Sequence, residues 1–382
     1  MKLLILITFA ISFTLSLYGY EVDQFTDRGK PLSDSTKALD KLILNKLTTA
    51  LQDANSGFLS TNLGTTSCDG TEQNQRDSRF KLFEALRDYL VTQSPIGIIE
   101  DFANSNKNIS KRIININDSI YSTAKDHSII LKKFGLSPVI KINSIEIGTD
   151  KLGHFFDEGY GLYLSSYKME TKVSKLGTDL LSEKSLEQGS LGITTTNIKS
   201  YGDMAANYDG TQFWNRLCGW ATLDSSLEEK EYFKKNKCLP NAYIKCEQGK
   251  WKFNESQKFS IADYVTSAWD EAINCSSYTE EISDLVFTEL SKKVYQYKGN
   301  PKQPCPAEPQ KCLEIENKYS KKVFKIITNP ICRNIAKKIK SNETVDSTTK
   351  FDYTYKNTSD YKPTQSNKPT IKELREKVST KK

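Results

Sequence analysis

The stretch GTDKLGHFFDEGYG, residues 148–161, brings together the residue types that acid–base or metal chemistry requires. It holds one of the two histidines of the 382-residue chain, together with three carboxylates and a lysine. On a helix that turns by 100° per residue, Asp150, His154 and Asp157 lie along one line. Asp150 comes four residues before His154, a spacing at which a carboxylate can orient an imidazole. The stretch therefore predicts an amphipathic helix whose polar line is either a site, with His154 as a general base or a metal ligand, or a structural polar network.

A second stretch, SYGDMAANYDG, begins at Ser200 and predicts another helix with a polar face. Ser200 is a typical N-cap residue. Asp203 either supports that cap or belongs to an acidic site. Asn207 has no such capping role, and asparagine forms helices poorly. Its presence in the helix therefore favours a role in a site. If the two helices face each other, Asp203 and Asn207 approach the polar line of the first helix.

Together the two stretches supply a candidate site. The candidate catalytic residues are Asp150, Lys151, His154, Asp203 and Asn207. Asp150, His154 and Asp203 carry the carboxylate and imidazole groups that could hold a divalent metal ion as cofactor. Lys151 could bind an anionic group of a substrate. His127, the other histidine, is assigned to a solvated segment.

Three glycines interrupt the first stretch: Gly153, Gly159 and Gly161. Each interior glycine costs a helix about 1 kcal/mol relative to alanine. That cost predicts that another backbone or a ligand approaches the helix closely at these positions.

The pair DKLGHFF and SYGDMAANYDG resembles the VanZ-like pattern, in which a D-K-x-x-H-F helix is followed by a D-x-x-A-N-x-x-G helix. The resemblance covers about residues 145–215. The matching residues are Asp150, Lys151, His154 and Phe155 in the first element and Asp203, Ala206, Asn207 and Gly210 in the second, with Glu187 as a counterpart of an acidic position between them. The family includes VanZ-type membrane proteins linked to glycopeptide resistance and small envelope proteins, so the resemblance implies a role in the cell envelope. This chain departs from the membrane members, because after residue 20 it has no apolar span of membrane length.

The elements that must position these residues are mostly helices. Apolar spacing predicts helices over 34–55, 79–93 and 96–104, from Ser200, and over the stretches KFSIADYVTSAWDEAINCSSY and TEEISDLVFTELSKKVYQY. Within the former stretch, Trp269, Asp270, Glu271 and Asn274 are assigned to a helix surface and its C-cap. The β-branched run PVIKINSIEIG predicts a short hairpin that turns at Asn143-Ser144. The predicted fold is mainly α: an irregular multi-helix body with one short β-hairpin.

The N-terminus and the cysteines indicate an exported protein. Residues 1–20 have the lysine and apolar run of a secretory signal peptide. Eight cysteines follow, seven of them in the C-terminal half, and an even number in an exported chain indicates disulfides. The predicted regions are a signal peptide (1–20), a helical domain with the motif pair (21–217), a disulfide-braced Cys-rich helical region (218–336) and a disordered basic tail (337–382).

The charge argues against a nucleic-acid partner. The formal net charge of the chain is +7. The predicted tail contributes +6 of it, with twelve Lys or Arg against six Asp or Glu, and Lys2 in the predicted signal peptide contributes the remaining +1. The body is therefore close to neutral and has no basic stripe. No G-x-S-x-G, H-E-x-x-H or P-loop motif occurs in the sequence.

Two interpretations of function follow. In the first, the chain is an exported cell-envelope protein, periplasmic or secreted to the outer surface, whose two-helix polar core is a structural or ligand-binding element. Its partner would be another envelope component, and no membrane span would remain after signal removal. In the second, it is a metal- or His/Asp-dependent envelope enzyme that acts on a cell-wall or lipid substrate.

Overall fold

The chain is mainly α-helical, as predicted. The structure is a computed structural model that describes residues 21–56, 67–91, 96–168, 193–219, 225–293, 305 and 307–343. The predicted signal peptide, Glu187 and the tail from residue 344 onward lie outside the described residues. Within the described ranges, no helix has both the length and the apolar character that crossing a bilayer requires.

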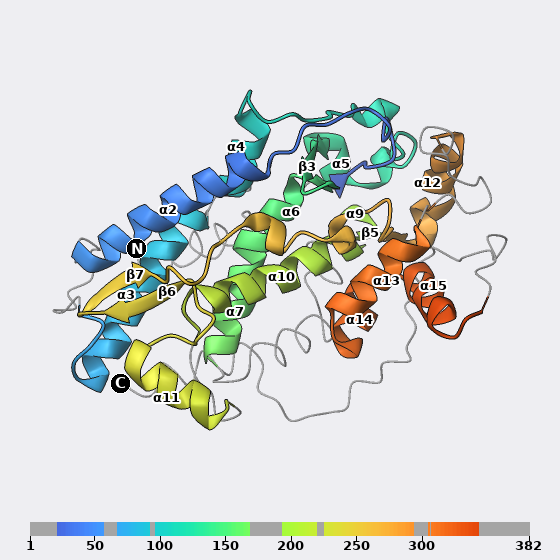
Figure 1. Ribbon diagram of the computed structural model, residues 1–382. Coiled ribbons are helices and arrows are strands. Elements are labelled where there is room, and N and C mark those ends of the chain that lie inside the picture. Colours follow the sequence, from blue (N-terminus) through green and yellow to red (C-terminus); the bar gives the residue numbers. More distant parts are fainter. Residues whose placement is uncertain are drawn as a thin grey trace, which may run out of the picture.

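Helices make up most of the described chain (Figure 1). The helices are α2 (Thr36–Ser56), α3 (Glu72–Leu90), α4 (Ile98–Ser105), α5 (Ile129–Phe134), α6 (Asp150–Gly153), the π-helical η3 (His154–Glu158), α7 (Gly159–Lys168), α9 (Ile193–Thr196), α10 (Tyr201–Cys218), α11 (Leu227–Asn236), α12 (Glu280–Lys293), α13 (Pro309–Lys318), α14 (Lys321–Ile327) and α15 (Pro330–Lys340). Single 3-10 turns form η1 (Ile116–Asp118), η2 (Lys125–His127), η5 (Ile261–Asp263) and η6 (Ser267–Trp269).

The strands are short and pair in twos. They are β1 (Glu21–Val22) with β2 (Leu136–Ser137), β3 (Val139–Ile142) with β4 (Ile145–Gly148), β5 (Ile198–Lys199) with β8 (Ser277–Tyr278), and β6 (Ile244–Glu247) with β7 (Lys250–Phe253). The β1–β2 pair is parallel, and the other three are antiparallel.

Helix α10 lies in the middle of the molecule and packs along α7 and η3 (Figure 1). On one side, α2 packs against α3 and the β6–β7 hairpin. On the other, α14 packs against α10 and α13 against α15. Buried apolar side chains from α2 through α15 form one contiguous cluster, so both halves of the chain share a core.

The predicted hairpin leads directly into the motif stretch. Val139 pairs with Gly148 across β3 and β4. Asn143 and Ser144 both have positive φ, as the turn of such a hairpin requires. Because β4 ends at Gly148, the hairpin fixes where the helix from Asp150 begins.

All eight cysteines form disulfides, which confirms the predicted bracing. Three bridges lie within the C-terminal half and one joins the two halves: Cys218–Cys238, Cys275–Cys305, Cys312–Cys332 and Cys68–Cys246. The long-range bridge ties the residues just before α3 to β6, across a sequence separation of 178 residues.

The predicted helix over KFSIADYVTSAWDEAINCSSY is wrong. Only single turns form there, η5 and η6, and the stretch ends in β8. Each turn has a hydroxyl N-cap: Ser260 accepts a hydrogen bond from the backbone N–H of Ala262, and Thr266, which separates the two turns, accepts one from that of Ala268. Such local bonds compete with helix propagation. At the C-terminus, α15 continues to Lys340, four residues into the predicted tail.

Candidate functional site

The motif stretch is not one regular helix. A turn of α6 is followed by the π-helical η3 and then by α7. A π turn is wider than an α turn, so residues three and four apart no longer keep their α-helical phase. Asp157 accordingly does not share the line of Asp150 and His154 as predicted. Its carboxylate points towards α4, where a Cβ added to Gly97 would lie 2.8 Å from Oδ2.

Lys151 is the centre of the site. Its ammonium is fully buried and contacts Asp150 Oδ2 at 2.6 Å, Asp203 Oδ1 at 2.5 Å and Glu271 Oε1 at 2.6 Å. These three carboxylates come from α6, α10 and the loop after η6. Gly202 makes room for the lysine, because a Cβ there would lie 2.9 Å from Lys151 Cε. The Asp150 contact is a hydrogen bond and the other two are ion pairs, so the buried charge of Lys151 is surrounded by opposite charge from three elements.

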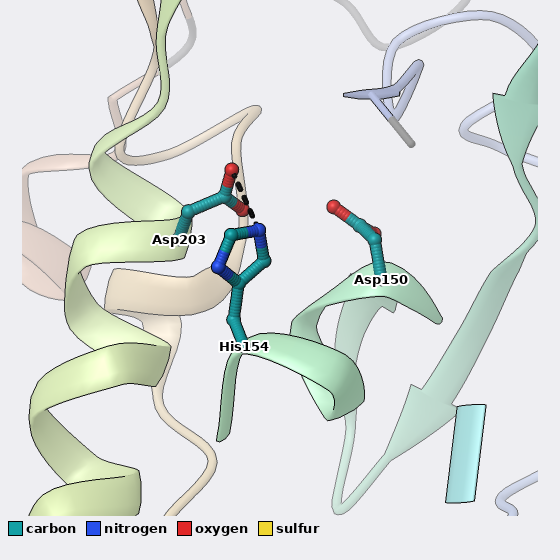
Figure 2. A group of neighbouring side chains, drawn as sticks. All are labelled: Asp150, His154 and Asp203. Carbon is teal, nitrogen blue, oxygen red and sulfur yellow. Dashed lines mark ion pairs between the residues drawn. The ribbon is translucent and has the colours of Figure 1, made fainter. Parts of the chain in front are cut away.

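His154 lies between η3 and α10 (Figure 2). Its Nε2 is 3.2 Å from Asp203 Oδ2, and its Nδ1 is 3.1 Å from Asn207 Oδ1. The predicted approach of Asp203 and Asn207 to His154 is therefore observed. The prediction that Asp150 orients the imidazole is wrong, since α10 supplies both of these partners.

The facing helices touch backbone to backbone. A Cβ added to Gly159 would lie 2.7 Å from Gly210 Cα, and one added to Gly210 would overlap the carbonyl oxygen of Phe155. Trp214 Nε1 donates to the carbonyl of Phe156 across the same interface. The glycine prediction is correct for Gly159 and wrong for Gly161, where an added Cβ would meet no atom within 4 Å.

Two carboxylates at the site escaped the sequence analysis. Glu271 was assigned to a helix surface but is buried. Ser200 Oγ donates to its Oε1 at 2.7 Å, and Ser276 Oγ donates to its Oε2 at 3.0 Å. Gln24 fixes its backbone, because the N–H of Glu271 donates to Gln24 Oε1. Trp269, Asp270 and Asn274 of the same stretch are buried as well.

The other missed carboxylate is Glu100 on α4. Its side chain packs against α6 at Gly153, where an added Cβ would be 2.7 Å from Glu100 Oε2. Glu100 is 3% exposed, and its Oε1 has no hydrogen-bond partner among the described residues. The apolar pattern of α4 gave no reason to assign Glu100 to a site, because one acid on a short helix is usually a surface residue.

Burial and charge set the ionisation of the site. Burial raises the pKa of Asp150 to about 6, against the attraction of Lys151. Burial also raises the pKa of Glu100, to about 8, and the nearby charge of Asp150 adds to this shift. Burial acts to raise the pKa of Asp203 too, but the attraction of His154 and Lys151 is larger and lowers this pKa below its ordinary value. For Lys151, three carboxylates outweigh burial and raise its pKa well above its ordinary value.

We refer to Asp150, Lys151, His154, Asp203, Asn207 and Glu271 as the polar core. Its arrangement can support two kinds of chemistry: an ionic network that joins distant elements, or coordination of a cation by the carboxylates and the imidazole. His127 pairs with Glu281 on α12 at 2.8 Å and is exposed, so it contributes to neither.

No protein-family model, curated protein or solved structure matches the chain. Its function is therefore inferred from its own residues.

Proposed function

We propose that the chain is an exported cell-envelope protein whose VanZ-like polar core is a structural or ligand-binding element. The observation that carries this proposal is the fully buried ammonium of Lys151, which contacts carboxylates from three separate elements. Breaking a buried ion pair costs about 3–5 kcal/mol, so each of these elements depends on the others. The polar core would thus hold the motif helices and the Cys-rich region in one arrangement.

Export is proposed from the sequence of residues 1–20 and from the disulfides. Four disulfides fit an oxidising compartment such as the periplasm or the outer surface. Fractionation of the source cells, followed by mass spectrometry of the N-terminus, would test this. We expect the chain outside the cytoplasm, without residues 1–20, and its recovery intact in the cytoplasm would refute export.

Hydrogen exchange measured by mass spectrometry would test the structural role. In Asp203→Asn, which keeps the shape of the side chain but removes its charge, we expect faster exchange in both 150–158 and 268–276. Asp126→Asn is the matched control, because Asp126 forms an exposed pair with Lys132 at 2.9 Å. If Asp203→Asn leaves exchange at 268–276 unchanged, the core does not join these elements.

The alternative is a metal- or His/Asp-dependent enzyme acting on a cell-wall or lipid substrate. It is favoured by the grouping of Asp150, His154 and Asp203, whose potential ligand atoms lie within 4.8 Å of one another. Two observations favour the structural role. Both ring nitrogens of His154 have side-chain partners, and the whole polar core is buried. A general base needs to reach the proton that it abstracts.

A further inference from the structure

His154 and Asp203 are spaced like two ligands of one metal ion. Their facing atoms, Nε2 and Oδ2, are 3.2 Å apart. Two ligands bound tetrahedrally at 2.0–2.2 Å would be about 3.3–3.6 Å apart. Asp150 points into the same space from α6 (Figure 2), and the potential ligand atoms of all three residues lie within 4.8 Å of one another. Small side-chain shifts would bring the three into one coordination sphere.

Asn207 prepares His154 for this role. The amide oxygen of Asn207 can only accept a hydrogen bond, so the Nδ1 atom that faces it carries the proton. In the neutral imidazole, the lone pair then lies on Nε2, which faces Asp203. Metal-binding histidines are usually oriented in this way by a hydrogen bond to the other ring nitrogen.

The charges around this space also call for a cation. Three buried carboxylates, those of Asp150, Asp203 and Glu271, surround Lys151. Lys151 offsets one of these charges and a protonated His154 offsets a second, which leaves one buried carboxylate charge without a partner. Asp150 Oδ1 and Glu100 Oε1, both buried, have no hydrogen-bond partner among the described residues. Buried charge is costly unless it is paired or bound to a metal.

Lys151 occupies only one oxygen of each of the two aspartates. It contacts Oδ2 of Asp150 and Oδ1 of Asp203, so one oxygen of each carboxylate stays outside the lysine contacts. A carboxylate can contact an ammonium with one oxygen and a metal ion with the other. An ammonium placed in this way orients the carboxylate towards the metal. Lys151 would therefore hold the two carboxylates in place.

We propose that Asp150, His154 and Asp203 bind one divalent first-row transition-metal ion, with Asn207 and Lys151 as positioning residues. One imidazole and two carboxylates suit Zn²⁺ or Mn²⁺. The inference rests on the proposed function, since it identifies the ligand of the polar core as a cation.

The test uses the full chain with its disulfides intact, stripped with a chelator and dialysed. Isothermal titration with Zn²⁺ and with Mn²⁺ should show one site for at least one of these ions. His154→Ala should weaken that binding at least tenfold, whereas His127→Ala should leave it unchanged. Co²⁺ added to the unaltered chain should give the visible absorption bands of a nitrogen- and oxygen-coordinated ion. These bands provide a direct result even if His154→Ala fails to fold.

Three results would overturn the metal site. The first is titration without a stoichiometric site for either ion, the second is equal affinity in His154→Ala, and the third is a Co²⁺ spectrum identical to that of the free ion. The proposed function fails separately. Suppose that Asp203→Asn speeds hydrogen exchange in both 150–158 and 268–276 in chelator, but the unaltered chain binds no ion. The structural role of the polar core then stands, and only the metal site is wrong.

Discussion

Replacing Lys151 by methionine gives the sharpest test of the polar core. Methionine has a similar length, so the substitution removes the charge with little change in volume. It leaves Asp150, Asp203 and Glu271 buried without the ammonium that each contacts at 2.5–2.6 Å. Removing one partner of a buried ion pair costs about 3–5 kcal/mol, because the other partner keeps its desolvation penalty.

That loss is large compared with the stability of the whole chain. Proteins unfold with a free energy of about 5–15 kcal/mol, so a loss of about 3–5 kcal/mol is at least about a fifth of it. At roughly 2–4 °C per kcal/mol for large domains, we expect the melting temperature to fall by roughly 6–20 °C. Circular dichroism at pH 7 in chelator measures this drop without any contribution from a bound ion.

A matched control and a rescue separate the network from a general effect of losing a lysine. Lys132 pairs with Asp126 on the surface, so Lys132→Met should change stability by less than about 0.5 kcal/mol. Adding Glu271→Gln to Lys151→Met removes one of the stranded charges and should restore part of the lost stability. A melting temperature of Lys151→Met less than about 6 °C below that of the unaltered chain, which is the low end of the expected range, would refute the reasoning.

Three further predictions follow from buried charge, backbone contact and covalent bracing. Glu100 has a folded pKa of about 8 against an ordinary value of 4.5, so the folded chain keeps a proton that the unfolded chain releases between these pH values. Stability therefore falls as pH rises through this window, and Glu100→Gln should gain stability over the unaltered chain at pH 8.5 but not at pH 4, as measured by urea unfolding in chelator. Gly210→Ala should prevent native packing, because its Cβ would overlap a backbone carbonyl of η3, whereas Gly161→Ala should stabilise the chain by up to about 1 kcal/mol in thermal melts. Replacing both Cys68 and Cys246 by alanine should cost about 2–5 kcal/mol and more than removing any of the bridges that span 20 or 30 residues, because the closed loop is longest; equal midpoints in urea would contradict this.

The sequence predicted the parts of the site that depend on local rules. Ser200 caps α10 as expected, with its Oγ accepting from the N–H of Asp203. The hairpin turns at the predicted residues, and the two motif helices meet through Asp203 and Asn207. Capping, turn chemistry and side-chain spacing act within a few residues, so the sequence alone reveals them.

Other features depend on tertiary packing. The π turn of η3 changed which residues face α10, and no spacing in GTDKLGHFFDEGYG indicates it. Glu271 and Glu100 reach the site from segments that no motif or spacing connects with the motif pair. The apolar pattern around Glu271 predicted a helix, but Ser260 and Thr266 cap separate single turns, and Glu271 lies in the buried loop after the second of them.

The N-terminal segment shows how far this dependence extends. Gln24 holds the backbone of Glu271, and Arg28 makes two hydrogen bonds to the neighbouring Asp270, at 2.6 and 3.0 Å. The third contact of Lys151 therefore depends on residues more than 240 positions away in the chain. Contacts of such sequence separation carry a large entropy cost, because a long loop must close before any contact compensates for it. The contact of Lys151 with Glu271 thus requires the N-terminal segment, the motif helices and the Cys-rich loop together, so the charge pairing of Lys151 is complete only in the whole fold.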